Sequence, residues 1–212
     1  MSEQPAAAAP VARIPSARRL LKALAMAVGL MLVAPLLLLA WLEKSCSRSE
    51  EVFTGCAQLL ALVPGLPGVL LRGAYYFGTL ARCSWEVRLG FGSHLTHRGA
   101  RLGARVSTGS FCVIGHAEIG DDVMMASRVS IPSGKRQHLD EQGRLSSSAA
   151  RFDTVRIGSH SWVGEGAIIM ADVGAWSIVS AGAVVVTEMP QRALIGGNPA
   201  KVIRSMDAPG GS

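Results

Sequence analysis

The stretch that decides the fold runs from Val155 to Arg204 and reads VRIGSHSWVGEGAIIMADVGAWSIVSAGAVVVTEMPQRALIGGNPAKVIR. A small residue follows most of its large aliphatic residues, which recur every six positions at Ile157, Val163 and Ile169 and again at Val173, Val179 and Val185. A period of six fits neither an amphipathic helix nor an alternating strand, and it is typical of a parallel β-helix built from hexapeptides. We therefore predict a mainly β fold in which three hexapeptides make one triangular coil of about eighteen residues.

The repeat extends upstream to about Leu89, with two irregularities that predict short corners. The register slips by one residue between Thr108 and Ile119, and Val173 follows Ile169 after only four positions. The period disappears over residues 132–154, which are polar and rich in Gly and Ser, and a long excursion of this kind is usually a functional loop. Residues 191–204 are expected to cap the open end of the β-helix, and residues 205–212 are expected to fray.

The N-terminal third predicts hydrophobic helices. Residues 1–19 are basic and rich in Ala and Pro, which favours a disordered tail. Two uncharged runs, 23–42 and 52–71, then predict a membrane hairpin or re-entrant segment over residues 20–72, because about twenty apolar residues span the hydrocarbon layer. A buried soluble helix packed on the β-helix is the alternative for 52–71, and residues 73–88 are expected to be an interfacial linker.

Charge gives the expected orientation of this hairpin. Cations precede the first run, and Arg72, Arg82 and Arg88 follow the second, so both ends are expected in the cytosol. The whole chain carries a formal charge of +6, but its cations do not gather into a nucleic-acid-binding face. Its four cysteines form no disulfide framework and no Cys/His metal spacing, and we expect neither nucleic acid nor metal as a partner.

The segments IGSHSWVGEGAII, VSAGAVV and GGNPAKVIR resemble the hexapeptide-repeat acyltransferases, and in particular the sugar and xenobiotic O-acetyltransferases. The resemblance covers roughly Leu89 to Arg204. It implies that the parallel β-helix is left-handed, that acetyl-CoA is the acyl donor, and that the protein is a homotrimer whose active sites lie between two subunits.

His138 is the candidate catalytic base. It is the one histidine of the chain's five that falls in the polar excursion, and an imidazole suits removal of a proton from an acceptor hydroxyl. Members of the resembled family carry their catalytic histidine at the start of such a loop, where SGKRQH aligns. A metal site made by His116, His138 and His160 is not expected, because these residues are 22 apart rather than one coil length apart.

The resemblance also implies the coenzyme and acceptor contacts. Lys201 and Arg204 align with basic residues that meet the phosphates of coenzyme A, and as neighbours at i and i+3 they would share one face of a helical turn. Further positions align with the pantetheine groove or its surroundings: Gly164, Glu165, Ala181, Gly182 and Thr187. Ser110 and Trp162 are the candidate acceptor contacts, with Trp162 either lining the groove or covering a neighbouring subunit. Ser110 replaces an asparagine and Thr187 a lysine of some relatives, which puts acceptor identity and phosphate contact in doubt.

These features together predict an O-acetyltransferase on the cytoplasmic membrane, with its catalytic domain facing the cytosol. The acceptor is expected to be a hydroxyl of a sugar in a lipid-linked or cell-surface polysaccharide. Two alternatives stay open: an acetyltransferase for a small soluble acceptor such as serine, an amino-sugar or an antibiotic, and a β-helix scaffold without activity.

Overall fold

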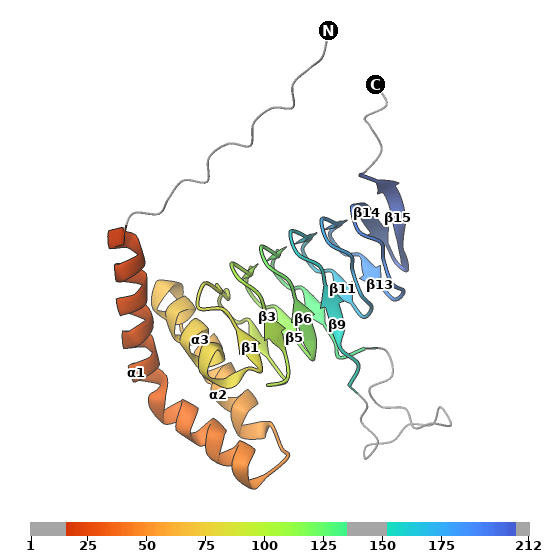
Figure 1. Ribbon diagram of the computed structural model, residues 1–212. Helices are drawn as coiled ribbons and strands as arrows, with labels where there is room; N and C mark the ends of the chain where they lie inside the picture. Colours follow the sequence, from red (N-terminus) through yellow and green to blue (C-terminus); the bar gives the residue numbers. More distant parts are fainter. Residues whose placement is uncertain (1–15, 135–151, 207–212) are drawn as a thin grey trace.

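Three helices precede a parallel β-helix (Figure 1). The structure is a computed structural model that describes residues 16–134 and 152–206; His138 and most of the predicted terminal tails lie outside the described residues. The helices are α1 (Ser16–Cys46), α2 (Glu51–Ala61) and α3 (Gly65–Thr79).

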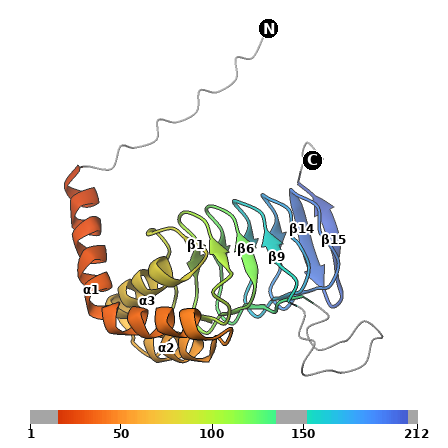
Figure 2. The ribbon, with the colours of Figure 1, turned by 60° about the horizontal axis from the view of Figure 1, so that its bottom comes forward.

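The β-helix has three sheets, one on each side of a triangular prism (Figures 1 and 2). Sheet A contains β1 (Arg82–Cys83), β3 (Arg101–Leu102), β6 (Ala117–Ile119) and β9 (Val155–Ile157). Sheet B contains β4 (Ser107–Thr108), β7 (Met124–Met125), β10 (Trp162–Val163), β12 (Ile178–Val179), β14 (Ala193–Gly197) and β15 (Ala200–Ser205). Sheet C contains β2 (His94–Leu95), β5 (Val113–Ile114), β8 (Ser130–Ile131), β11 (Ile168–Ile169) and β13 (Val184–Val185).

The coils depart from the eighteen residues expected from three full hexapeptides: in the first coil Cys83 pairs with Leu102, nineteen residues later, and the coils that follow are shorter. Ile157 pairs with Val173, sixteen residues later, and Leu102 pairs with Ile119, seventeen residues later. The missing residues are lost where the chain passes from sheet C to sheet A, a corner that we call the C–A edge. The predicted short step from Ile169 to Val173 falls at this edge, as does the slip before Ile119, so both predicted short corners are confirmed. The gap in the described chain between Gly134 and Phe152 also falls at this edge, between β8 and β9.

Inward-pointing aliphatic side chains stack from coil to coil and form the core. Ile157, Val163 and Ile169 are each at most 1% exposed. The small residue after each strand is required by the close approach of the next coil: a Cβ on Gly158 would lie 2.2 Å from the backbone nitrogen of Ala175. Real Cβ atoms do not approach a nitrogen that closely, so the Gly at these corners permits the coil spacing.

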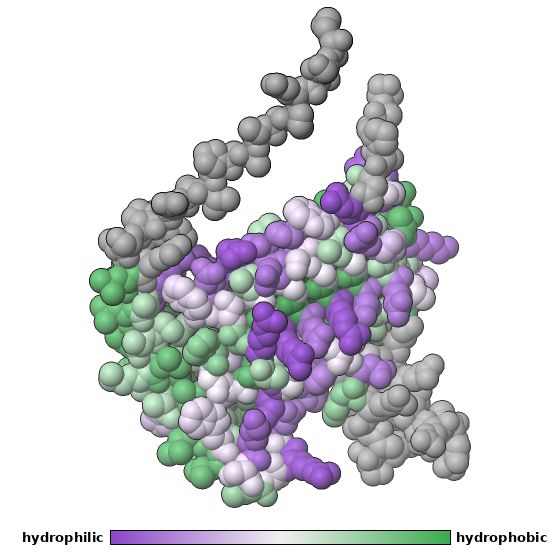
Figure 3. All heavy atoms as spheres, in the orientation of Figure 1, coloured by the Kyte–Doolittle hydropathy of each residue, from purple (hydrophilic) through white to green (hydrophobic). Residues whose placement is uncertain are grey.

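The outward positions give the three sheets different surfaces. Sheet A carries an alternating ladder of charges, in which Glu118 pairs with Arg101 and Arg156, both at 3.3 Å, and Arg156 pairs with Asp172 at 3.4 Å. Hydrophilic residues form the purple band across the coils in Figure 3. Sheets B and C instead present apolar outward residues. Met124, Trp162 and Ile178 lie on neighbouring strands of sheet B, whereas on sheet C the polar Ser130 lies between Val113 and the neighbours Ile168 and Val184.

The second apolar run and the expected linker form a plug on the first coil, which differs from the sequence-based expectation. The run 52–71 is divided between α2 and α3, whose inner faces are buried. Tyr75 and Tyr76, expected in an interfacial linker, are fully buried. The Tyr76 hydroxyl accepts a 2.8 Å hydrogen bond from Leu95 N–H, and the Tyr75 hydroxyl donates to the Phe53 carbonyl at 3.0 Å. The structure thus favours the alternative of buried helices packed on the β-helix, because the open end of the first coil needs an apolar cover.

Arg72 also departs from its expected role as an exposed flanking cation. It is fully buried, and its guanidinium donates to the carbonyls of Leu60, Val63 and Leu89 at 2.8–3.1 Å. Arg72 therefore contributes nothing to the charge pattern from which the membrane orientation is predicted.

Within the described part of the chain, Leu20–Cys46 is the one helical stretch long and apolar enough to cross a membrane. One side of α1 packs on α3 and buries Val33, Leu37 and Ala40, while its other side is exposed. The location of the protein at a membrane remains a prediction.

Candidate functional site

Five of the predicted site residues lie on one edge of the prism, where the chain turns from sheet B to sheet C. We call this the B–C edge. Ser110, Gly164, Glu165, Ala181 and Gly182 all lie along it. Gly182 N–H donates to the Glu165 carbonyl at 2.8 Å, and Ser110 N–H donates at 3.2 Å to Ser127 Oγ on the coil between them. The structure therefore brings the proposed pantetheine contacts and one acceptor contact onto a common edge.

The B–C edge is narrow because its backbone leaves little room for side chains. A Cβ on Gly164 would lie 2.5 Å from Ala181 N. Gly166 and Gly182 both have φ of +68°, a left-handed conformation that favours glycine, and no atom lies within 4 Å of a Cβ built on either. The edge thus leaves open space beside the backbone at Gly166 and Gly182, where an extended ligand could lie against it.

Glu165 is a charged residue of this edge, and its carboxylate faces a cation. It is 3.7 Å from the Arg128 guanidinium, and both side chains are largely exposed. An exposed pair of this kind contributes little to stability, so either partner can exchange the other for a ligand.

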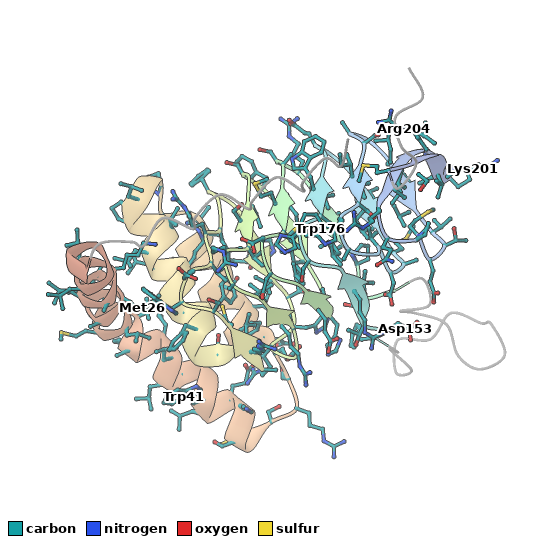
Figure 4. The ribbon with its side chains drawn as sticks, turned by 45° about the horizontal axis from the view of Figure 1, so that its top comes forward. Met26, Trp41, Asp153, Trp176, Lys201 and Arg204 are labelled. Carbon is teal, nitrogen blue, oxygen red and sulfur yellow. The ribbon has the colours of Figure 1, made fainter. Side chains whose placement is uncertain are left out.

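Lys201 and Arg204 lie on strand β15 instead of on the predicted helical turn. This strand pairs antiparallel with β14, with Lys201 opposite Gly196 and Arg204 opposite Leu194. Residues i and i+3 of a regular strand point to opposite faces. A bulge beside Leu194/Ile195 adds one residue to β15, which turns Arg204 back to the face of Lys201. Because directly opposed residues share a face, both cations lie on the outward side of the last coil (Figure 4). The expectation that they share a face therefore holds, for a reason other than the predicted one.

Thr187 lies away from the B–C edge, although it was predicted to contact the same coenzyme. It follows β13 and lies at the C–A edge, across the width of sheet C. The five-residue step from Gly166 to Ala171 across that sheet corresponds to about 15 Å of extended chain. The structure also separates Trp162 from this edge: it projects from β10 in the middle of sheet B, between Met124 and Ile178, and is 42% exposed.

The loop that carries His138 is anchored at the C–A edge, although His138 itself lies outside the described residues. His116 holds both ends of the loop. Its backbone N–H donates to Ser133 Oγ at 2.8 Å, and its Nδ1 is 2.9 Å from Thr154 Oγ1. A hollow of about 350 Å³ lies at this edge. Its lining includes Gly134, Asp153, Thr154, Met170, Asp172 and Glu188.

A histidine–carboxylate pair that sequence reasoning missed lies beside the same loop. His97 Nδ1 is 2.6 Å from Glu50 Oε2, and the ring of Phe152 lies 4.3 Å from the His97 ring. Burial raises the pKa of Glu50, but the hydrogen bonds from His97 and from Arg98 N–H outweigh it and hold this pKa below its ordinary value. The pair borders a hollow of about 510 Å³. A carboxylate at Nδ1 orients an imidazole so that Nε2 can accept a proton. No sequence signal relates these residues, because they are 47 positions apart.

The remaining histidines have structural surroundings. The His160 ring stacks on Trp176 with 4.1 Å between ring centroids. His94 lies on β2 with its Nδ1 3.4 Å from the Gly92 carbonyl. No three His, Cys, Asp or Glu side chains converge as metal ligands would, as far as the described residues show.

The fold is that of solved acetyltransferase structures. A maltose O-acetyltransferase from Clostridium difficile superposes with a TM-score of 0.65 and 22% identity, over 75% of this chain and 87% of that one. A hexapeptide-repeat-containing acetyltransferase from Vibrio cholerae gives 0.62 and 22%, over 77% and 96%. Searched against known family models, the chain matches none.

One protein of known sequence resembles a shorter part of the chain. The candidate acetyltransferase YJL218W of Saccharomyces cerevisiae is 39% identical over 54 residues, which cover 24% of this chain and 28% of the yeast protein. The chain thus matches little more than a quarter of that relative. By its fold, the protein is a left-handed parallel β-helix with an N-terminal helical plug, as the likeness to these solved structures shows.

Proposed function

We propose that the protein transfers an acetyl group from acetyl-CoA to a hydroxyl group. The observation that carries the proposal is the B–C edge: Gly164, Glu165, Ala181 and Gly182, which align with pantetheine contacts of the resembled acyltransferases, lie together there, with open space beside Gly182. Lys201 and Arg204 lie together at the last coil, where they can meet phosphate groups. The acetyltransferase descriptions of the matched structures and of the yeast relative support the same activity.

His138 is our candidate for the base that takes the proton of the acceptor hydroxyl. Direct attack of that oxygen on the thioester carbonyl forms a tetrahedral oxyanion, and collapse of this intermediate releases the coenzyme thiolate, which the proton neutralises. Backbone N–H groups are proposed to stabilise the oxyanion. His97, oriented by Glu50, is the second candidate because it is the histidine whose Nδ1 a carboxylate holds at 2.6 Å.

The positions of the loop and of the coenzyme edge favour a site shared between subunits. Within one chain, the loop leaves from the C–A edge, on the far side of sheet C from Gly164 and Ala181. Sheets B and C also carry exposed apolar side chains such as Met124, Trp162 and Val113. We propose a homotrimer in which such faces meet, so that the loop of one subunit reaches the coenzyme edge of the next.

The acceptor is proposed to be a hydroxyl of a sugar in a lipid-linked or cell-surface polysaccharide. The support is the exposed apolar surface of α1, which suits attachment to a membrane. The catalytic domain would then face the cytosol, where acetyl-CoA is available.

The experiment that tests this function measures coenzyme release and acceptor mass. Full-length protein in mild detergent is incubated with acetyl-CoA and a panel of glycolipid extracts, sugars and serine. Free thiol and an acetyl mass increment on one acceptor are expected, and both should fall in the His138→Ala variant. Absence of acetyl-CoA binding and turnover across the panel would favour a scaffold. If His97→Ala abolishes turnover while His138→Ala does not, the base is the His97–Glu50 pair.

A further inference from the structure

α1 is fixed along one side to the rest of the molecule. A Cβ on Gly78 would lie 2.8 Å from a methyl group of Leu37, and one on Gly29 would lie 3.2 Å from Ala74 Cβ. Trp41 Nε1 donates to the Gly78 carbonyl at 3.0 Å. Such close approach at two glycines shows that α1 is docked on α3, and that α1 is unlike an isolated span surrounded by lipid.

The opposite side of α1 is an uninterrupted apolar stripe. Leu24, Met31 and Leu38 are 61%, 76% and 57% exposed, and they follow one another at helical spacing on the same face. Other members of the stripe are Leu20, Val28, Leu32, Leu39 and Leu42. Figure 3 shows this end of the molecule as a hydrophobic surface. Cations stand near both ends of the stripe, with Lys22 at one end and Lys44 at the other. An apolar helical face bounded by lysines suits the interface of a membrane with anionic lipids.

Beside this stripe an apolar groove of about 500 Å³ opens between α1, α3 and the first coil. Its walls are hydrocarbon, with Met26 on α1 (Figure 4), Val69 and Leu70 on α3, and Val87 on the coil. Trp85, 39% exposed, also lines it. The volume lies in the range of small-molecule sites, about 300–1,000 Å³.

The polar groups of the groove are suited to an anion. Lys22, Glu86 and Arg88 line it. The Glu86 carboxylate is shared, at 4.0 Å from Lys22 and 3.5 Å from Arg105. The exposed Arg88 side chain makes no ion pair or hydrogen bond with any described residue. The groove therefore combines a hydrocarbon interior with a cation that has no partner, which matches an amphiphile with an alkyl chain and an anionic head group.

We propose that this groove binds one acyl chain of an anionic lipid drawn from the bilayer, with Arg88 at the head group and Lys22 beside it. The exposed stripe of α1 would hold the opening of the groove at the membrane surface. A bound lipid would then fix the orientation of the β-helix relative to the membrane. This inference rests on the membrane association in the proposed function but is independent of acyl transfer.

The test uses tryptophan quenching by lipids brominated along their acyl chains. In a variant in which Phe replaces Trp41, Trp162 and Trp176, Trp85 is the remaining tryptophan and reports on the groove. Vesicles of zwitterionic lipid with a brominated phosphatidylglycerol should quench Trp85. In this background Val69→Glu, which places a carboxylate in the hydrocarbon wall, should remove most of the quenching. Arg88→Gln should raise the lipid concentration needed for half-maximal quenching of Trp85 by about five-fold. Arg82→Gln is the matched control, because it removes the same charge outside the groove.

The outcomes separate the groove from membrane attachment and from catalysis. A parallel variant that keeps only Trp41 reports on the stripe of α1. Quenching of Trp41 without quenching of Trp85 would overturn the groove proposal and leave membrane attachment intact. Equal quenching of Trp85 in the Val69→Glu variant would also overturn it. If a brominated fatty acid below its micelle concentration quenches Trp85 but vesicles do not, the occupant is a free amphiphile and the proposal of a bilayer lipid is wrong. Loss of acetyl transfer with Trp85 quenching unchanged would refute only the proposed enzyme function.

Discussion

Replacing the buried arginine of α3 should test how the helical plug is held on the β-helix. Arg72 Nη1 donates to the carbonyls of Leu60 and Val63 at 2.9 and 2.8 Å, and its Nε donates to that of Leu89 at 3.1 Å. It thereby joins the C-terminal end of α2, whose last carbonyls lack partners within the helix, to α3 and to the first coil. Burial lowers the pKa of Arg72, yet an arginine stays protonated at neutral pH, so a cation meets the negative end of the α2 dipole.

The magnitude follows from two opposing effects of Arg72→Met. The substitution keeps most of the side-chain volume but leaves the carbonyls of Val63 and Leu89 without another donor among the described residues. Each unsatisfied carbonyl costs about 1–3 kcal/mol of stability. It also removes a buried charge that has no carboxylate partner among the described residues, and whose Nη2 makes no hydrogen bond with them, which offsets part of that cost. We expect a net loss of about 3 kcal/mol in the free energy of unfolding.

The assay is urea unfolding in mild detergent, followed by tryptophan fluorescence. Arg82→Met removes the same charge from the exposed β1 position and should change the free energy by at most about 0.5 kcal/mol. Arg72→Lys keeps the charge but not the forked geometry and should fall between the two. If Arg72→Met is as stable as the unaltered protein, the guanidinium does not hold the plug and the reasoning is wrong.

Four further predictions concern the site and the assembly. His138→Ala should lower turnover by about 10²–10⁴-fold while coenzyme affinity survives, with His160→Ala as the control, and equal turnover in both variants would exclude His138 as the base. The double variant Lys201→Ala, Arg204→Ala should raise the KM for acetyl-CoA more than that for the acceptor, and unchanged values would make both residues surface charges. Light scattering in mild detergent should give a trimer, and an active monomer would refute the shared site. Burial raises the pKa of Cys83 to about 12, so at pH 8 a maleimide should label the exposed Cys46 much faster than Cys83; equal rates would contradict this packing.

The β-helix could be predicted from the sequence because its determinants are local and repeated. Each inward aliphatic residue such as Val163 or Val179 needs a partner one coil away, and each corner needs a small residue such as Gly158. These requirements recur at a nearly fixed spacing, so they are visible without knowledge of any long-range contact. The two short corners were also visible as interruptions of that spacing. Alignment of motifs to these corners located Gly164 and Ala181, which the structure places on one edge.

Only the tertiary structure decided the features that depend on contacts across long separations. The hydropathy of residues 52–71 suits a membrane segment and a buried plug equally well. The structure favours the plug, because the open end of the first coil needs an apolar cover. Arg72 resembles an exposed flanking cation in the sequence, but the carbonyls of three different segments surround it. A β-bulge, which leaves no mark in the sequence, placed Lys201 and Arg204 on one face of the last coil. The pairing of Glu50 with His97 likewise required α2 to dock beside β2, the first strand of sheet C. Composition and periodicity describe what a segment can bury, and only packing determines what it contacts.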